Sequence, residues 1–239
     1  MRKYKILGVI LARSGSKSIK NKNIAIINGH PLIAYTISSA LKSKSFHDIV
    51  VSTDSKKIQK ISKKFGADVP FLRPKKISGD KAKAVDALHH ALVFCEKKNK
   101  IKYDYIVELM CTNPLKNSTD IKKVINLQIK SKADSVIAVL KLNDHHPIRI
   151  KKIVNKKIRN FCLNEVTETH RQDLKPNAYI RCGSIYSMRR DMLLKKIRYG
   201  TKNSLAYIMP SKRVVNIDEK EDLEYAEFKM KKYSTKIEK

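Results

Sequence analysis

The chain of 239 residues has no tryptophan, and it has only seven glycines, seven prolines and four cysteines. The cysteines lie far apart, without a Cys-x-x-Cys pair, so the sequence predicts neither a zinc site nor a disulfide framework. We expect reduced thiols, which are typical of cytoplasmic proteins. A long apolar run is also missing at the N-terminus. The run at 6–11 is too short for a membrane-spanning helix and makes a poor signal-peptide core.

Acidic residues are scarce as well: 22 of them stand against 52 lysines and arginines, which gives a formal net charge of +30. Such a charge raises nucleic-acid binding as a hypothesis, because Lys and Arg release counterions from a phosphate backbone. The lysines, however, are spread over nearly every expected helix and turn, without interleaved aromatic platforms. We therefore favour a solvated, lysine-rich surface, whose positive field attracts small polyanionic substrates.

What the chain does contain is a regular alternation of short Val- and Ile-rich runs with longer segments of helical period. This pattern is typical of βαβ units and predicts an α/β fold with a Rossmann-like, mostly parallel sheet in one main domain. We expect strands at 5–12, 48–53, 67–72, 103–109, 135–142, 179–188 and 214–217, and helices at 31–42, 55–65, 81–98, 119–131 and 219–232. Two β-like pieces around Asn155-Lys156 predict a hairpin excursion. We expect the Lys-rich tail after Tyr233 to be disordered.

The loop after the first expected strand reads ARSGSKSIKNKN over 12–23. In an open parallel sheet the ligand site lies at the carboxyl ends of the strands, where this loop begins. Ser14-Gly15-Ser16 allows close approach of backbone amides to phosphate oxygens, and Arg13, Lys17 and Lys22 supply positive charge. The loop fits neither the GxGxxG nor the GxxxxGK[ST] pattern. Its chemistry alone is compatible with a phosphate site or with a solvated turn.

The longer string ILARSGSKSIKNKNI resembles the ARxGSKGIxxKN signature of the CMP-sugar synthetases, the cytidylyltransferases that activate acidic 2-keto sugars. These include acylneuraminate cytidylyltransferase and CMP-legionaminic acid synthetase. Further segments resemble motifs of this family in the same order: IVVSTDS, FLRPKKISGDKAKAVDALHHAL, LMCTNPLK, DHHPIRI, RQDLKPNAYIRCGSIY and NIDEKEDLEYAE. Because these motifs follow one another along most of the chain, the resemblance is specific.

The resemblance implies a fold of the nucleotide-diphospho-sugar transferase type (GT-A-like). It also implies one domain over 1–232, a dimerisation and sugar-binding excursion at 143–178, and a Lys-rich tail at 233–239. The implied reaction is that of CTP with an acidic nonulosonate to give a CMP-sugar and pyrophosphate, in a cytoplasmic homodimer that serves surface polysaccharide synthesis. Three alternatives stay open: a Kdo-type cytidylyltransferase, a UTP-using sugar nucleotidyltransferase, and a basic nucleic-acid-binding protein with a degenerate active site.

By the same resemblance, the nucleotide is expected to bind Arg13, Ser14, Gly15, Ser16, Lys17, Lys22, Asn23, Asp80, Met110 and Thr112. Arg13, Lys22 and Asp218 are the expected catalytic residues. The guanidinium and the ammonium would neutralise the reacting phosphate oxygens. The sugar is expected to bind Arg149, Arg171, Gln172 and Tyr186, since a guanidinium matches a carboxylate in geometry. Tyr186 is equally compatible with a core position.

The family also implies Mg²⁺ between the phosphates, held by an Asp-x-Asp pair. Here the sequence departs from the pattern, because Asn216 replaces the first of the two aspartates and only Asp218 keeps its charge. Asn216 can offer its carbonyl oxygen, but we expect weaker attraction for the metal.

Further departures concern the substrate rather than the reaction. Met110 and Cys111 replace a Gln-Pro pair, Ala84 replaces a Ser, and Cys182 replaces an Asn of the family pattern. We expect the changes at Ala84 and Cys182 to remove polar contacts around the nucleotide and the sugar. This predicts a relative of sialic acid, such as legionaminic or pseudaminic acid, without choosing between them.

Overall fold

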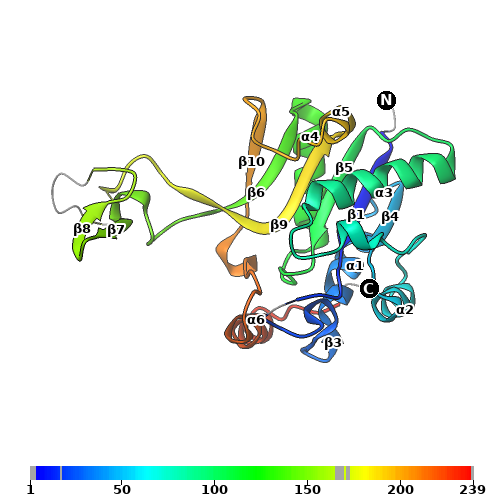
Figure 1. The fold of residues 1–239 in the computed structure, drawn as a ribbon, viewed down its shortest axis with the longest axis horizontal. Helices are drawn as coiled ribbons and strands as arrows, with labels where there is room; N and C mark the ends of the chain where they lie inside the picture. The colour runs from blue at the N-terminus through cyan, green and yellow to red at the C-terminus, as the bar shows by residue number, and fades with distance from the viewer. Residues whose placement is uncertain (1–3, 17, 165–169, 171–172, 238–239) are drawn as a thin grey trace.

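The computed structural model describes residues 4–16, 18–164, 170 and 173–237. A six-stranded sheet consists of β1 (Ile6–Leu11), β4 (Asp48–Ser52), β5 (Tyr105–Met110), β6 (Ser135–Lys141), β9 (Tyr179–Arg189) and β10 (Ser204–Ile208). Its strand order is β10-β6-β9-β5-β1-β4 (Figure 1). β9 is antiparallel to β5 and β6, while the β10–β6, β5–β1 and β1–β4 pairs are parallel. The predicted α/β fold with a mostly parallel sheet is confirmed.

The α-helices of the described residues are α1 (Leu32–Ser43), α2 (Lys56–Lys64), α3 (Ala84–Asn99), α4 (Ser118–Ser131), α5 (Arg190–Leu194) and α6 (Lys220–Lys232). Helices cover both faces of the sheet, with α1, α2 and α4 on one face and α3 on the other, whereas α6 packs with α1 and with the segment at 215–217. β1 is buried on both faces of the sheet, and this explains why its sequence is apolar throughout. Ile6 and Ile10 pack in the cluster that contains residues of α1, α2 and α4, whereas Leu7 and Val9 pack with α3. Among the described residues, no helix is long and apolar enough to cross a bilayer.

Shorter elements shape the loops: η1 (Lys22–Ile24), β2 (Ile26–Ile27), β3 (His30–Pro31), η2 (Lys75–Ile77), η3 (Pro147–Arg149), β7 (Lys151–Val154), β8 (Lys157–Asn160) and η5 (Ser211–Arg213). β7 and β8 form a hairpin on an arm that extends away from the sheet, at the left of Figure 1. Asn155 and Lys156 have φ values of 50° and 62°. Positive φ at both central residues is the geometry of a two-residue hairpin turn, so the expected hairpin is present.

Two expected strands are wrong. Residues 67–72 pair with β4 only through isolated bridges at Asp68 and Leu72, and Pro70 between them has no N–H to donate. At 214–217, Ile217 donates its N–H to the Thr112 carbonyl oxygen at 2.9 Å, but the segment forms no ladder. Val215 and Ile217 are buried, so the alternation of apolar and polar residues at 214–217 reflects side-chain burial and not pairing with another strand.

The tail also differs from expectation. The Thr235 N–H donates to the Met230 carbonyl oxygen at 2.8 Å, and Ile237 packs against the core cluster that includes Leu115 and Ile217. The Thr235 hydrogen bond and the packing of Ile237 hold the described end of the tail against the domain, and the prediction of disorder is wrong for residues 235–237.

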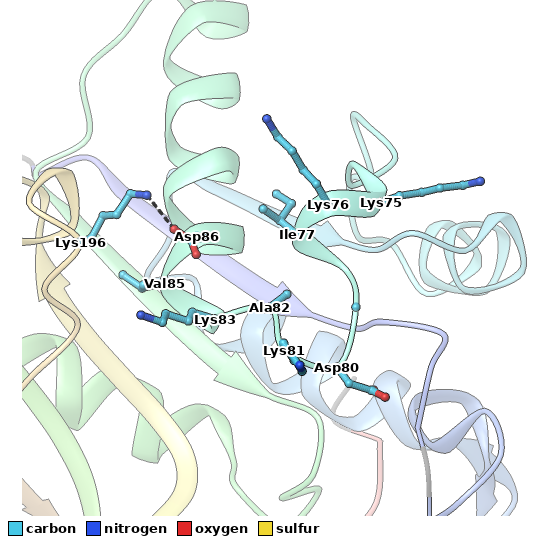
Figure 2. Close-up of a pocket in the computed structure, with 11 residues that line it drawn as sticks. Lys75, Lys76, Ile77, Asp80, Lys81, Ala82, Lys83, Val85, Asp86 and Lys196 are labelled. Atoms are coloured by element: carbon cyan, nitrogen blue, oxygen red, sulfur yellow. Dashed lines mark hydrogen bonds and ion pairs between the residues drawn. The ribbon is translucent and has the colours of Figure 1, made fainter.

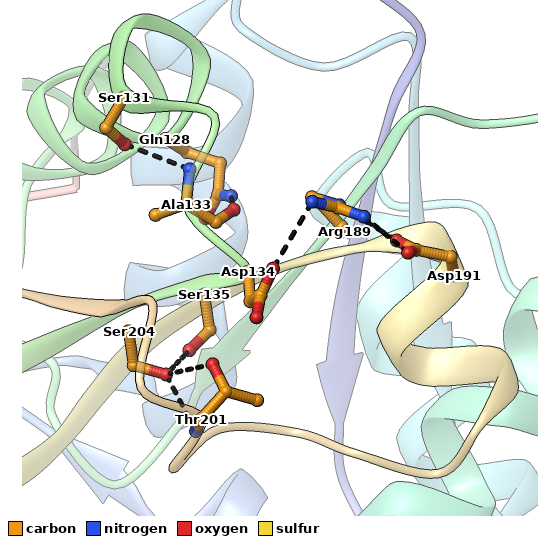
Figure 3. A network of polar contacts seen from close by, with 9 residues as sticks. All are labelled: Gln128, Ser131, Ala133, Asp134, Ser135, Arg189, Asp191, Thr201 and Ser204. Atoms are coloured by element: carbon orange, nitrogen blue, oxygen red, sulfur yellow. Dashed lines mark hydrogen bonds and ion pairs between the residues drawn. The ribbon is translucent and has the colours of Figure 1, made fainter.

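A polar network fixes the edge where β6 begins and β9 ends (Figure 3). Arg189 contacts Asp134 at 3.2 Å and Asp191 at 2.5 Å. The Ser135 hydroxyl donates to Ser204 Oγ at 2.8 Å and so ties β6 to β10. These contacts lie at the edge opposite the basic loop, which leaves the carboxyl edge of the parallel strands for function.

Candidate functional site

Three parallel strands end together at one edge of the sheet. Leu11, the last residue of β1, is in register with Ser52 of β4 and with Met110 of β5. The loops that leave these strands, together with the segments at 73–83 and 214–218, form the rim. The basic loop 12–23 is therefore located where sequence analysis placed it.

The basic loop is anchored by a carboxylate that sequence analysis did not select. Asp54 follows β4, and it accepts one hydrogen bond from the Ser14 N–H and one from the Ser14 hydroxyl, both at 2.8 Å. The Asn23 amide donates to the Arg13 carbonyl oxygen at 2.9 Å and joins the two ends of the loop. The sequence feature that could have indicated Asp54 is its position directly after the neighbouring parallel strand.

A second carboxylate, which belongs to the segment at 214–218, contacts the basic loop. Lys22 Nζ donates to the Ile217 carbonyl oxygen at 2.8 Å and to Asp218 Oδ1 at 2.9 Å. The Ser18 hydroxyl donates to the Asp218 carbonyl oxygen. The Asn216 amide donates to Asp218 Oδ2 at 2.5 Å. Three predicted residues, Lys22, Asn216 and Asp218, are thus brought together across almost the whole length of the chain.

Asn216 is itself held by a close backbone contact. Gly183 of β9 has a φ of +56°, and a Cβ there would lie 2.8 Å from Asn216 Oδ1. Any larger residue at this position would displace the Asn216 side chain. The amide oxygen therefore lies against β9, and the amide nitrogen lies against Asp218.

Arg13 contacts Asp80, which is one of the residues that line a cavity of about 700 Å³ in front of α3 (Figure 2). Its guanidinium contacts Asp80 Oδ1 at 2.8 Å, and both side chains are partly exposed. The cavity is lined by a loop that leads into α3 and by Lys196, which contacts Asp86 at 2.8 Å. Asp80, predicted to bind the nucleotide, lines this cavity beside Arg13.

Arg73 is a second arginine of the rim that sequence analysis missed as a site residue. It is buried, and its Nη2 donates to the Ser52 carbonyl oxygen at 2.7 Å, while its Nε has no hydrogen-bond partner among the described residues. Burial lowers the pKa of the Arg73 guanidinium, the Asp54 carboxylate opposes this shift, and Arg13 adds to it. The sequence feature that could have indicated Arg73 is the Arg-Pro dipeptide near the start of FLRPKKISGDKAKAVDALHHAL, a segment that resembles a family motif.

A buried lysine fixes the loop after β5. Lys116 Nζ donates to Thr36 Oγ1 at 2.7 Å, to the Met110 carbonyl oxygen at 2.6 Å and to the Asn113 carbonyl oxygen at 2.7 Å. Burial lowers the pKa of Lys116 to about 8, while the three acceptors match the three donors of an ammonium group. The adjacent Thr112 hydroxyl is buried, and no residue in the described part of the chain pairs with it.

The predicted sugar residues do not gather at this rim. Tyr186 is 5% exposed, and its ring is covered by Arg198 and Tyr199. Arg149 lies on the arm, 3.8 Å from Asp144. Lys17 of the nucleotide set, and Arg171 and Gln172 of the sugar set, lie outside the described residues.

Two of the departures from the family pattern are buried. Cys182 is 4% exposed, and its Sγ lies 3.6 Å from Met209 Sδ. Cys111 is in the same core cluster. Their side chains are in the core cluster, and the expected effect of Cys182 on polar contacts around the sugar stays a prediction.

The rim has too few protein side chains of the ligand type to hold a metal ion by themselves. Within the described residues, no three His, Cys, Asp or Glu side chains are grouped as metal ligands. Asp218 is the carboxylate at the expected position, and Lys22 and Asn216 already contact it. One carboxylate fits a Mg²⁺ that also takes phosphate oxygens as ligands, which is a common arrangement for this ion.

The family model described as "Cytidylyltransferase" matches residues 7–234. The chain belongs to the cytidylyltransferase family. It is therefore a nucleotidyltransferase, and the prediction of a cytidylyltransferase is confirmed.

Known proteins similar to this cytidylyltransferase cover nearly its whole length. It is 35% identical to post-translational flagellin modification protein B of Campylobacter coli, with 95% of each chain covered. It is also similar to two proteins of Campylobacter jejuni. It is 32% identical to pseudaminic acid cytidylyltransferase and 33% identical to CMP-N,N'-diacetyllegionaminic acid synthase, with 93% of this chain and 94% of each relative covered.

A solved structure resembles the fold. It is a CMP:2-keto-3-deoxy-manno-octonic acid synthetase complexed with CTP, with a TM-score of 0.70, 18% identity, and 96% of this chain and 99% of that chain covered. At this identity the likeness concerns the fold.

Proposed function

We propose that this cytidylyltransferase transfers CMP from CTP to an acidic nonulosonate sugar, such as pseudaminic, legionaminic or N-acylneuraminic acid. The anomeric hydroxyl oxygen bonds to the α-phosphorus and releases its proton to solvent. The bond between the α-phosphorus and the oxygen that bridges to the β-phosphorus breaks, and pyrophosphate leaves with that oxygen. The observation that carries the proposal is a cationic loop held open at the sheet edge by Asp54 and Asp218. Apart from its chain neighbours, no described residue lies within 4 Å of a Cβ placed at Gly15, so a phosphate has room to approach the backbone there.

In this proposal, the nucleotide contacts Arg13, Ser14, Gly15, Ser16, Lys17, Lys22, Asn23, Asp80, Met110 and Thr112. Arg13 and Lys22 neutralise the charge that develops on the phosphate oxygens. Arg13 now pairs with Asp80, so triphosphate binding would exchange a carboxylate for a phosphate partner. The buried Thr112 hydroxyl, which has no partner, is available to a nucleotide group.

Substrate selection tests the proposal most simply. Each of the four nucleoside triphosphates is incubated with Mg²⁺ and a panel of acidic 2-keto sugars, and products are identified by mass spectrometry. We expect a CMP conjugate from CTP and a nonulosonate. A lack of CTP preference would contradict the proposal. A preference for an eight-carbon octulosonic acid would support the Kdo-type alternative.

We further propose that Mg²⁺ enters with CTP and is held by Asp218, with the Asn216 carbonyl oxygen as a weaker ligand. When bound, the ion would neutralise phosphate charge and polarise the α-phosphate. The proposal is supported by the position of Asp218 beside Lys22, a residue of the cationic loop.

Substitutions at these two positions have opposite expected effects. Asp218→Ala should lower Mg²⁺-dependent turnover by roughly a hundredfold, because the charged ligand is lost. Asn216→Asp should lower the Mg²⁺ concentration needed for half-maximal rate, since it adds a second carboxylate. Titration of Mg²⁺ in a pyrophosphate-release assay measures both, with Glu221→Ala as the control for an exposed acid of α6. Normal turnover by Asp218→Ala would show that the metal assignment is wrong.

We also propose that residues 143–178 form the dimerisation excursion of a single domain over 1–232. The hairpin exposes apolar side chains, with Ile153 77% and Ile158 70% exposed. An isolated two-stranded hairpin is marginally stable in water, so these side chains need a cover, which we take to be a second copy of the chain. Arg149, Arg171, Gln172 and the strand of Tyr186 would then complete the sugar site across the dimer. The four free cysteines favour a cytoplasmic location.

Complementation tests this shared site. Arg13→Ala lacks a working rim but keeps the arm, and Arg149→Ala keeps the rim but lacks the arm contact. If each site combines one rim with the partner's arm, an equal mixture should recover about a quarter of wild-type activity, because half the dimers are mixed and each has one intact site. Activity is compared before and after subunit exchange. No recovery, despite exchange, would contradict the shared site.

A further inference from the structure

Arg198 lies against β5, which carries Met110, and β9, which carries Tyr186, although it belongs to none of the predicted sets. It follows α5, and its guanidinium carbon is 4.1 Å from the centroid of the Tyr186 ring. Its Nη2 is 4.0 Å from Met110 Sδ. Lys196, two residues earlier, lines the same cavity as Asp80 and contacts Asp86 (Figure 2). One side chain therefore touches both Met110 and Tyr186.

Glu108 fixes the guanidinium and cancels its charge. This residue pairs with Tyr186 across β5 and β9, is 2% exposed, and accepts from Arg198 Nε at 2.5 Å. Burial raises the pKa of the Glu108 carboxyl, and the adjacent Arg198 cation opposes that shift. The ion pair thus supplies N–H donors in a fixed position without adding net charge.

Aromatic rings enclose the pair. Tyr186 and Tyr199 stack with ring centroids 5.7 Å apart, and Arg181 lies over Tyr199 at 4.7 Å. Tyr186 is 5% exposed, whereas the Arg198 side chain is 17% exposed. A ligand at this end of the rim therefore meets Arg198 and Tyr199 before it reaches Tyr186.

We propose that Arg198 is a sugar-binding residue that sets specificity, by donating a hydrogen bond from the exposed edge of its guanidinium to the carbonyl oxygen of an acylamido substituent. This inference rests on the proposed function. A neutral ion pair favours a neutral acceptor over the sugar carboxylate, which Glu108 would repel. The planar guanidinium and the Tyr199 ring also suit a flat amide group. A sugar with a hydroxyl group at that carbon lacks the carbonyl oxygen and gains nothing from the contact.

Arg198→Lys tests the proposal, because lysine keeps the cation that Glu108 needs but loses the planar fork. With the acylamido sugar that reacts best, we expect the KM for sugar to rise roughly tenfold or more and the KM for CTP to change less than about twofold. With the analogue that carries a hydroxyl group in place of the acylamido group, wild type and Arg198→Lys should have similar kcat/KM.

Arg190→Lys is the matched control, since Arg190 makes the same kind of partly buried ion pair with Glu96, at 2.7 and 2.9 Å, away from the rim. It should leave the KM for sugar unchanged. An unchanged KM for sugar in Arg198→Lys, or an equal penalty with the hydroxyl analogue, would overturn the role of Arg198. The proposed function would stand in that case, because the wild type still forms the conjugate. Absence of any conjugate from the wild type contradicts the proposed function itself.

A second variant covers the case in which Arg198→Lys does not fold. Tyr199→Leu leaves the Glu108–Arg198 pair intact and removes one flanking ring. We expect a rise of severalfold in the KM for the acylamido sugar and none for the hydroxyl analogue. The same KM for the acylamido sugar as in wild type would also overturn the proposal.

Discussion

The mutual repulsion of its own cations is the constraint that shapes this rim. Arg13 and Lys22 lie in one loop of a chain with a net charge of +30, and like charges so placed repel each other. Carboxylates from two other segments hold it, one through the Ser14 backbone and hydroxyl and the other through Lys22 Nζ. Since neither carboxylate covers Gly15, the loop is fixed while its open side remains accessible.

One edge of the sheet is held by polar contacts within the protein, and the other edge carries the proposed site. At the edge where β6 begins, Arg189 and the acids around it are satisfied by one another. At the carboxyl edge, Arg73 Nε and the Thr112 hydroxyl are buried and have no hydrogen-bond partner among the described residues. Buried groups without a partner also occur elsewhere, such as Gln128 Oε1 near the other edge, but these two lie where the nucleotide is proposed to bind and can be completed by a ligand.

The sequence predicted the elements whose pattern is local, and failed where tertiary contacts decide. Apolar runs located β1, β4 and β5, and with them the position of the basic loop. Burial without pairing at Val215 and Ile217 imitated a strand, and the short, half-exposed β10 gave no clear signal. Within the site, motif positions found Lys22 and Asp218, but the anchor at Asp54 and the Glu108–Arg198 pair depend on contacts between distant segments.

The affinity of CTP for Asp54→Ala, measured by calorimetry with Mg²⁺, tests the anchoring of the loop most directly. Removing a negative charge near a triphosphate should tighten binding by Coulomb's law alone, whereas loss of both Ser14 contacts should weaken it. The account predicts a Kd for CTP raised roughly tenfold, with Asp68→Ala, an exposed acid paired with Lys98, unchanged. A Kd for Asp54→Ala equal to or lower than that of the wild type would contradict the account.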